Sequence, residues 1–382
     1  MSMLSLARKE ICTGCSACAE KCAVGAMSMR SDEYGFLYPH IDKAKCTSCG
    51  ACAKACPLLK DIAPANVWPK CFIAKSKDID SLMQSSSGGM FTEFARKVMA
   101  MGGVVFGCVM HGGRAIHVKA EDMSGVSQMR GSKYVQSEMG ECFKDCKKEL
   151  DRGRQVLFSG TPCQIAGLLS YLGKDYSNLL TVGLICHGVA SPKSLSNYIE
   201  EEGHQRKTKV ISIEFRNKIA NPGESSVVVN FQGGSAKIES TWRNVYMRAF
   251  LLALSYRNSC FTCRFRSGRS GADIVIGDFW GIEKVSPEFP SKNGVSAVLI
   301  YTDKGMSAFA DVDIIKEPCG YSDVAKDNYN LDHNSHKKRM LRWCFLRVVK
   351  RRSSMYTFFR RYDKFDFLLR VIRSISNKLI KI

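Results

Sequence analysis

The chain has 382 residues, of which 45% are hydrophobic, and it carries 18 cysteines and a formal net charge of +20. This length predicts two or three domains with a sizeable core. No run reaches the roughly 18 apolar residues that a membrane-spanning helix needs, and cysteines begin too soon after residue 1 for a secretory signal, so we expect a cytoplasmic protein.

Eight cysteines in the first 56 residues form two copies of one pattern. The motif C-x2-C-x2-C-x3-C begins at Cys12 and again, 34 residues later, at Cys46, and Pro57 follows the second copy. This spacing is typical of paired 4Fe-4S clusters, in which the fourth cysteine of each copy reaches the other cluster. We therefore predict a bacterial-type two-cluster ferredoxin module over residues 1–60. The first ligand set is Cys12, Cys15, Cys18 and Cys56, and the second is Cys22, Cys46, Cys49 and Cys52.

Two other uses of cysteine fit this segment less well. A zinc site takes four ligands from two close pairs, whereas the segment has two quartets. A disulfide framework requires an oxidising compartment, for which the sequence carries no address. Iron–sulfur clusters therefore remain the favoured interpretation, and they predict a function in single-electron transfer.

Residues 61–150 are predicted to begin a mixed α/β body after a proline-containing linker at 61–70. A strand at 71–74 precedes the polar turn 85–89, which opens a helix at 90–101 and a buried strand at 104–109. Small residues at the start of a helix offer backbone N–H groups to an anion such as the phosphate of a flavin. A serine-rich helix cap without a ligand is an equally good interpretation.

Residues 151–325 are predicted to complete this body. We expect strands at 155–159, 179–186, 210–215, 227–231, 274–279 and 295–301, a turn at 160–163, and helices at 164–172 and 242–254. The strands at 210–215 and 227–231 are expected to be antiparallel. The alternation of strand, turn, helix and strand indicates a mixed α/β or α+β fold.

Four cysteines of the body fall in positions from which they could converge. Cys163 and Cys186 each lie at a predicted strand-to-turn junction, and Cys260 and Cys263 form a CxxC pair. A third 4Fe-4S cluster is one interpretation; buried thiols, zinc or a redox-active dithiol are others. His187 is a candidate acid or base, or a space-filling residue. The remaining cysteines are treated as structural: Cys71, Cys108, Cys142, Cys146, Cys319 and Cys344.

Three charged residues of the body have two interpretations each. Arg130 and Lys133 could bind phosphate or stabilise a reduced flavin, or they could be solvated surface cations. Asp278 could bind a ligand hydroxyl or ring nitrogen, or it could cap the turn that follows it. No catalytic residue can be assigned from these patterns.

Five segments of the body together resemble one known family. They are SSSGGMFTEFA, RGSKYVQS, LFSGTPCQIAGL, ICHGVASP and CxxCRFxxxRSGADIVIGDFWG. These motifs and their order resemble the coenzyme F420 hydrogenase/dehydrogenase beta-subunit family, over roughly residues 1–320. The family includes F420-reducing subunits, a chlorophyll-derivative reductase and many members found among polysaccharide biosynthesis genes.

The resemblance implies an iron–sulfur flavoprotein that passes electrons between clusters and FAD, which exchanges a hydride with an organic partner. It places Ser87, Gly88, Gly89, Arg130, Lys133 and Tyr134 near the flavin, and we add Asp278 to the cofactor-binding candidates. It also strengthens the prediction of a third cluster, because the family shares the motifs that carry these four cysteines. It does not identify the substrate, nor show whether the deazaflavin coenzyme is used.

The residues from 326 to 382 are predicted to form a basic amphipathic tail. Residues 336–382 contain fifteen Lys or Arg and two Asp, so +13 of the net charge of +20 lies there. Apolar residues recur at helical spacing: Phe365, Leu368, Leu369, Ile372, Ile375 and Leu379. Such a helix can lie on an anionic membrane surface or dock on the body of the protein. Nucleic-acid binding is not expected, because no recognition motif accompanies the charge.

These patterns together predict a cytoplasmic iron–sulfur flavoprotein oxidoreductase, with peripheral membrane contact through the tail as an open alternative. A ferredoxin-like carrier would exchange electrons with the clusters, and FAD would exchange a hydride with an organic substrate of unknown identity. Two other functions remain open. One is an electron-transfer subunit that serves a partner enzyme, for example in polysaccharide biosynthesis, without a substrate of its own. The other is a cluster-bearing scaffold that has lost its flavin.

Overall fold

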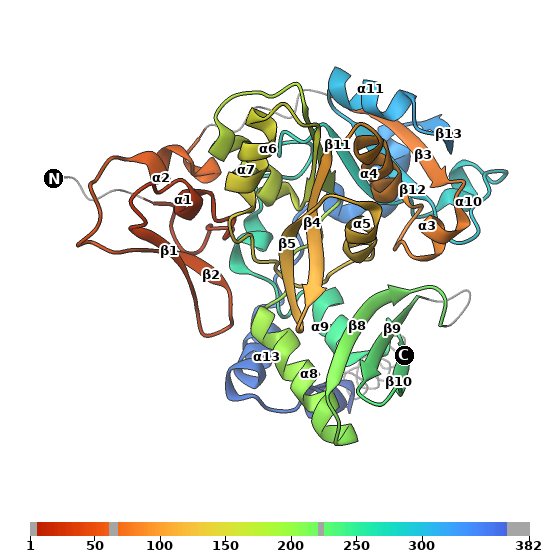
Figure 1. Ribbon diagram of the computed structural model, residues 1–382. Helices are drawn as coiled ribbons and strands as arrows, with labels where there is room; N and C mark the ends of the chain where they lie inside the picture. Colours follow the sequence, from red (N-terminus) through yellow and green to blue (C-terminus); the bar gives the residue numbers. More distant parts are fainter. Residues whose placement is uncertain (1–5, 61–67, 221–224, 365–382) are drawn as a thin grey trace, which may run out of the picture.

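The computed structural model describes residues 6–60, 68–220 and 225–364, which form three parts (Figure 1). A small cysteine-rich module at the N-terminus lies beside a body built on one large sheet. A second, smaller sheet with its own helices lies below that body in the view of Figure 1. The mixed α/β fold class and the N-terminal ferredoxin-type domain predicted from the sequence are both confirmed.

The N-terminal module has a repeated local structure. Its helices α1 (Ala17–Glu20) and α2 (Ala51–Lys54) are displaced by the same 34 residues as the cysteines. Each begins after a residue with positive φ, Ser16 at 68° and Gly50 at 75°. Between them lies an antiparallel hairpin of β1 (Met27–Ser31) and β2 (Leu37–Ile41), and a 3-10 turn at Pro57–Leu59 follows. The repeated backbone therefore presents the two cysteine quartets in equivalent ways.

The large sheet has eight strands in the order β13-β3-β12-β11-β7-β6-β4-β5. The central strands β11, β7, β6 and β4 are parallel, and the outer pairings are antiparallel. Strands that are buried on both faces have continuous apolar sequences, as in β6 and β12, where every residue is buried. The bounds are β3 (Lys70–Ser76), β4 (Val104–His111), β5 (Arg114–Ala120), β6 (Val156–Gly160), β7 (Leu179–Leu184), β11 (Ile274–Asp278), β12 (Ser296–Ile300) and β13 (Ile314–Cys319).

Helices cover both faces of this sheet, and neighbouring residues of a strand point to opposite faces. Phe106 of β4 packs with the residues of α6, α7 and α12, whereas Val105 packs with those of α4, α5 and α11. The bounds are α3 (Ile79–Met83), α4 (Met90–Ala100), α5 (Met123–Met129), α6 (Cys142–Asp151), α7 (Pro162–Leu172), α10 (Ile282–Val285), α11 (Asp303–Ala310) and α12 (Tyr321–Asp327). The body is therefore a three-layer structure with two apolar cores.

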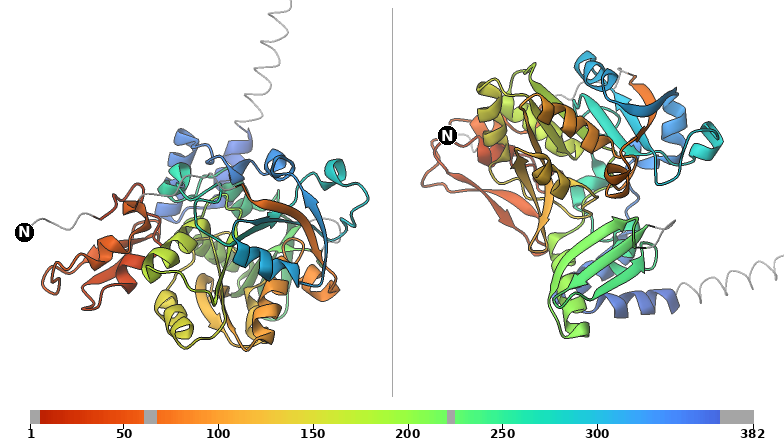
Figure 2. Two further views of the ribbon diagram at one scale, coloured as in Figure 1. Left: turned by 90° about the horizontal axis from the view of Figure 1, so that it is seen from above. Right: turned by 45° about the vertical axis from the view of Figure 1, so that its right-hand side comes forward.

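The smaller sheet has the antiparallel strand order β10-β9-β8, which confirms the expected pairing of β8 with β9. Its strands are β8 (Val210–Asn217), β9 (Ser226–Phe231) and β10 (Ala236–Ser240), and its helices are α8 (Pro192–Arg206), α9 (Val245–Leu251) and α13 (Arg339–Arg351). Phe215, Phe231 and Phe345 share one apolar core here. Figure 2 shows the last helices of the described chain, drawn in blue, lying against this unit.

Two predicted boundaries are wrong, and capping explains both. The helix predicted at 242–254 is only α9, because the side chain of Asn244 accepts the N–H groups of Tyr246 and Met247 and so fixes its start. The turn predicted at 160–163 is shorter, because Thr161 and Gln164 form a capping box and Pro162 opens α7. Cys163 therefore lies in the first turn of a helix.

The described part of the tail docks on the small-sheet unit. Phe345 and Val349 of α13 are fully buried, as are Met355 and Phe359 in the helical residues 355–364. The apolar stripe predicted from Phe365 to Leu379 lies outside the described residues. In the described ranges, no helix combines the length and the hydropathy needed to cross a bilayer.

Candidate metal and cofactor sites

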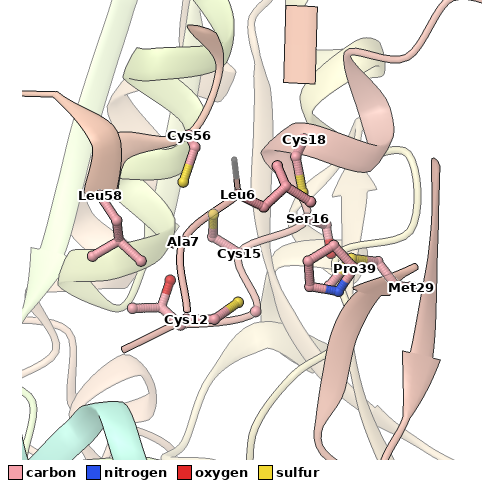
Figure 3. Close-up of a pocket in the computed structure, with 12 residues that line it drawn as sticks. Leu6, Ala7, Cys12, Cys15, Ser16, Cys18, Met29, Pro39, Cys56 and Leu58 are labelled. Carbon is pink, nitrogen blue, oxygen red and sulfur yellow. The ribbon is translucent and has the colours of Figure 1, made fainter. Parts of the chain in front are cut away.

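The first predicted cysteine set surrounds one hollow in the N-terminal module. Cys12, Cys15, Cys18 and Cys56 line it together with Leu6, Ala7, Met29, Pro39 and Leu58. Figure 3 shows the four sulfur atoms pointing towards a common space. Cys56 comes from the second quartet, so the structure brings together the crossed set that the spacing predicts. The buried hydroxyl of Thr13 in the same lining has no hydrogen-bond partner.

The second predicted set surrounds a neighbouring hollow. Cys22, Cys46, Cys49 and Cys52 line it, with apolar contacts from Met27 and Ile41. Cys49 is exposed, and its pKa is lowered by the backbone N–H of Ala51 and the hydroxyl of Thr47. Among the described residues, no three His, Cys, Asp or Glu side chains are spaced to hold a single metal ion. Four thiols around a hollow suit a cubane cluster, which keeps its ligands apart by its own four irons.

The two sets are adjacent, and the first is the more enclosed. Burial raises the pKa of Cys18 to about 12, and the thiolates of Cys12, Cys56 and Cys52 add to this. Cys52 belongs to the second set, so the two groups are close enough for their charges to interact. Thiols with such raised pKa values would hold their protons unless a positively charged centre bound the thiolates.

The four body cysteines also come together. Burial raises the pKa values of Cys163, Cys186 and Cys260 to about 12. The thiolate of Cys263 raises all three values further. Cys163 lies in the first turn of α7, Cys186 follows β7, and the CxxC pair spans the end of the 3-10 helix Asn258–Thr262. Three segments far apart in the chain therefore build a third cysteine group.

The third group lies next to the first set. Cys56 packs in one small apolar cluster with Cys163 and Cys263, around Leu58, Ala166 and Phe265. On the same side of α7, a Cβ at Gly167 would lie 3.0 Å from the Sγ of Cys15. The three groups therefore follow one another from the outer end of the module into the body.

The glycine-containing turn at 85–89 is tied to the loop at 130–134. The backbone N–H of Ser132 donates to the Oγ of Ser86 at 2.7 Å, and Arg130 donates to Gln84 at 2.7 Å. A Cβ at Gly88 would lie 2.6 Å from the carbonyl oxygen of Ala74, so only glycine fits. The predicted flavin residues from these two loops therefore come together. The Arg130 side chain is only 10% exposed and its Nε has no partner, so it is not a solvated surface cation.

Two lysines of this region are held by backbone carbonyls. Lys133 donates to the carbonyls of Met129 and Arg130, each at 2.7 Å, and burial lowers its pKa to about 8. Lys218 donates to those of Ser87 at 2.7 Å and Asn293 at 2.6 Å, and burial together with nearby Arg216 lowers its pKa to about 8. Sequence reasoning missed Lys218, because it follows an ordinary strand and no motif marks it.

Asp278 does not cap the turn that follows it. It accepts a hydrogen bond from Arg216 at 2.5 Å in an ion pair whose side chains are only 21% and 15% exposed. Burial opposes the charge of Arg216, but Asp278 and Tyr134 more than compensate and raise its pKa. The guanidinium also lies 5.7 Å from the ring centre of Trp280. Tyr134, Arg216 and Asp278 thus form one group, of which Arg216 was not predicted.

His187 lies between this group and the third cysteine group. It follows Cys186 directly, and its carbonyl oxygen accepts a hydrogen bond from Arg266 at 3.1 Å. The residue is exposed, yet partial burial lowers its pKa and nearby Arg266 lowers it further. To a smaller extent, the charge of Asp278 raises the pKa of His187 and the charge of Arg216 lowers it.

The six cysteines treated as structural lie elsewhere in the fold. Cys142 and Cys146 are buried at i, i+4 spacing in α6, and Cys71 of β3 lies opposite Cys319 of β13. Cys108 lies in β4 and Cys344 in α13. None of the six lines either module hollow.

Comparison with known proteins adds two matches to sequence families. The family of the C-terminal domain of the coenzyme F420 hydrogenase/dehydrogenase beta subunit matches residues 153–316, and the 4Fe-4S dicluster domain family matches residues 11–58. No curated protein matches the chain. Among solved structures, the xenon-derivatised F420-reducing NiFe hydrogenase complex from Methanosarcina barkeri contains a similar chain. It is 20% identical, with 71% of this chain and 92% of that chain covered and a TM-score of 0.47.

Proposed function

The chain belongs to the coenzyme F420 hydrogenase/dehydrogenase beta-subunit family, and from this we propose that it is an iron–sulfur flavoprotein oxidoreductase. When bound, 4Fe-4S clusters would supply single-electron transfer and FAD would supply two-electron hydride chemistry with an organic substrate. The 4Fe-4S module and the relation to oxidoreductase subunits rest on the two sequence matches. The flavin, the third cluster and the ligand assignments are our proposals.

One observation carries the proposal: the three cysteine groups follow one another and lead towards the predicted flavin residues. Cys49 of the second set is exposed at the outer end, where a carrier protein could approach. Cys56 and Cys163 pack together between the first and third groups. Beyond the third group, His187 lies near enough to the Arg216–Asp278 pair for the charges of that pair to act on its imidazole. An electron carrier needs its redox centres in close succession, whereas a metal storage or scaffold site does not.

The protein residues at the inner end suit a flavin. Gly88 and Gly89 let the turn pack against Ala74 and Ser76. The buried Nε of Arg130 lacks a partner, which an acceptor atom of the cofactor could supply. Lys133 and Lys218 place positive charge beside this region, which favours a phosphate or an anionic reduced flavin. The Asp278 carboxylate orients Arg216. These residues would bind and orient the cofactor, and we assign none of them a catalytic role.

The external carrier is proposed to be ferredoxin-like and acidic. Lys43, Lys45 and Lys54 are exposed on the segment that holds the second set. Of these, Lys45 is 4.0 Å from Asp42. Complementary charge mainly accelerates the encounter of two proteins, and this surface would attract a negatively charged partner to the exposed end of the cysteine groups.

An electron-transfer subunit without its own substrate is the second candidate. Exposed apolar side chains on the small-sheet unit favour it: Ile211 and Ile238 are 61% and 53% exposed, and Trp242 is 71% exposed. Scattered exposed apolar residues are common, but a docking surface for a partner enzyme would use such positions. This candidate keeps the electron path and places hydride transfer in the partner.

The decisive experiment is purification without oxygen, with iron, sulfide and flavin counted per chain. About eight irons indicates two clusters and about twelve indicates three. In the second case, Cys263→Ser should lower the count by about four, while Cys344→Ser, outside every group, should not change it. A preparation with neither iron nor flavin would refute the proposal, and one with iron but no flavin would favour the second candidate.

A further inference from the structure

Arg257 is a buried cation at the boundary between the module and the body. It has no exposed surface and is the largest fully buried side chain of the described residues. Its backbone belongs to the body, because its N–H donates to the carbonyl of Val189 and its own carbonyl accepts from Cys260. Its guanidinium reaches into the module, where Nε donates to the carbonyl oxygen of Cys12 at 2.7 Å and Nη2 to that of Leu37 at 2.9 Å.

The guanidinium is held firmly by neutral groups. Nη1 donates to Oε1 of Gln136 at 2.9 Å, and the same Gln136 donates through Nε2 to the carbonyl of Thr13 at 3.1 Å. The ring centre of Tyr38 lies 4.0 Å from the guanidinium carbon. A Cβ at Gly14 would lie 2.9 Å from Nη1, so the first cysteine loop follows the guanidinium closely.

No ion pair found within residues 6–60, 68–220 and 225–364 includes Arg257, and its oxygen acceptors are all uncharged. A buried cation is costly unless negative charge lies nearby. The negative groups available are thiolates: Nη2 lies 3.8 Å from the Sγ of Cys12, and the charge of Arg257 also lowers the pKa values of Cys163 and Cys260. Arg257 thus lies between the first cysteine set and the third group.

We propose that Arg257 is a positioning residue that raises the reduction potential of the first cluster. This rests on the proposed function, because it requires a 4Fe-4S cluster on Cys12, Cys15, Cys18 and Cys56. Such a cluster with four thiolates is negatively charged and gains one further negative charge on reduction. A fixed cation in a site of low dielectric stabilises the reduced form more than the oxidised form.

A cation also acts on Cys49 of the second set, but this residue, Lys54, is exposed, so solvent screens its charge more than that of the buried Arg257. Arg257 therefore makes the first cluster the better electron acceptor of the two. One electron would pass from the second cluster to the first. The second cluster would be oxidised by one electron and the first reduced by one electron, with no proton transferred. The reductant is the external low-potential carrier. The asymmetry directs electrons inward, towards the third group.

The test is a redox titration of the holoprotein, followed by electron paramagnetic resonance, with wild type, Arg257→Gln and Arg257→Lys. The first cluster is identified as the signal that Cys18→Ser alters. We expect Arg257→Gln to shift the midpoint potential of that signal downwards and to leave the second signal unchanged. Arg257→Lys keeps the positive charge, so the midpoint potential of the first signal should stay close to that of the wild type. Arg114→Gln, which removes an equal charge from a surface ion pair with Glu138, should shift neither.

The iron content shows whether a negative result contradicts the proposed function, contradicts this inference or reflects a misfolded variant. A wild-type protein without iron would refute the proposed function itself. If iron is present and Arg257→Gln loads it but leaves the midpoint unchanged, the inference is wrong. If Arg257→Gln loads no iron, the test uses Gln136→Glu instead. This variant keeps Arg257 in place but puts a carboxylate beside Nη1, which would neutralise the charge of the guanidinium. That variant should also lower the midpoint, and an unchanged value would refute the role of Arg257.

Discussion

Gly167 of α7 lies directly against Cys15 of the N-terminal module: a Cβ at position 167 would be 2.9 Å from the Cβ of Cys15 and 3.0 Å from its Sγ. Only a residue without a side chain permits this approach. The same helix carries Cys163, so the contact fixes how closely the first cysteine set meets the third group.

Gly167→Ala is therefore expected to move the module away from the body. Overpacking of a tight contact costs about 1–3 kcal/mol, which denaturation should detect, and electron transfer from module to body should slow while the iron content stays at the wild-type value. Rapid-mixing reduction with a ferredoxin-like donor measures the rate. Ser170→Ala on the same helix adds no atoms and serves as the control. Transfer at the wild-type rate in Gly167→Ala would show that this contact is not on the path.

Cys49→Ser is expected to remove the second cluster alone. Its exposed thiol lies in the second hollow, and the N–H of Ala51 favours its thiolate form. Iron should fall by about four per chain, and the module should become less stable, since the cluster links the two cysteine repeats. Iron analysis and limited proteolysis measure the two effects. Cys344→Ser is the control, and an unchanged iron content in Cys49→Ser would contradict the ligand assignment.

The sequence was informative where the relevant contacts are local. The crossed cysteine sets follow from a 34-residue repeat that also sets the positions of α1 and α2. The helix at 90–101 follows from its apolar periodicity, and α4 (Met90–Ala100) matches it closely. In these places one short segment determines its own structure, so neighbouring residues carry enough information.

Contacts between distant segments left no such signal. Arg216 is paired with Asp278 across 62 residues, and Lys218 contacts Ser87 across 131. Arg257 contacts Cys12 across 245 residues. Topology brings these residues together, and neither spacing nor composition indicates it. The docked part of the tail was detectable in principle, because Leu341, Phe345 and Val349 recur every four residues, but the surrounding arginines obscured them.

Asp278→Asn should weaken both the fold and flavin binding. It would leave the largely buried Arg216 guanidinium without its carboxylate, and breaking a buried ion pair in this way costs about 3 kcal/mol. Denaturation of the flavin-free protein and flavin counted per chain measure the two effects. Asp313→Asn, which removes a carboxylate that is 85% exposed and paired with Lys77, should change neither. Wild-type stability and flavin content in Asp278→Asn would contradict the role assigned to this pair.

Lys218 should make stability and flavin affinity depend on pH in opposite directions. Its pKa falls from 10.5 to about 8 on folding, through burial and nearby Arg216 and Lys75, with Asp278 opposing. Between these values the folded chain binds fewer protons than the unfolded chain, so the free energy of unfolding of the flavin-free protein rises with pH. Loss of the ammonium charge as pH rises through about 8 should weaken binding of an anionic flavin.

Denaturation and flavin titrations between pH 7 and pH 10 measure these two trends. Lys218→Met should reduce the pH dependence of both the free energy of unfolding and the flavin affinity. A smaller dependence should remain, because the pKa of Lys133 is also lowered to about 8 by burial. Equal slopes in wild type and Lys218→Met would exclude Lys218 as their source.

Two substitutions in α13 should separate docking of the tail from membrane contact. Phe345 is fully buried in the small-sheet core, so Phe345→Ala should cost about 3–5 kcal/mol. Trp343 is 57% exposed on the same helix, beside the guanidinium of Arg347. Trp343→Ala should change stability by no more than about 0.5 kcal/mol, yet weaken binding to vesicles that contain anionic lipid, since exposed tryptophan and arginine favour such surfaces.

Neutral vesicles and a chain ending at residue 364 are the controls for this pair. If the helix contacts lipid, wild type should bind anionic vesicles in preference to neutral ones, and the shortened chain should retain the binding that Trp343 and Arg347 provide. If the shortened chain loses all binding while Trp343→Ala loses none, the contact lies beyond residue 364 and α13 serves only the fold. If Phe345→Ala costs no more than Trp343→Ala, α13 does not dock on the small-sheet core in solution, because a side chain with no exposed surface cannot be removed from a packed core without loss of stability.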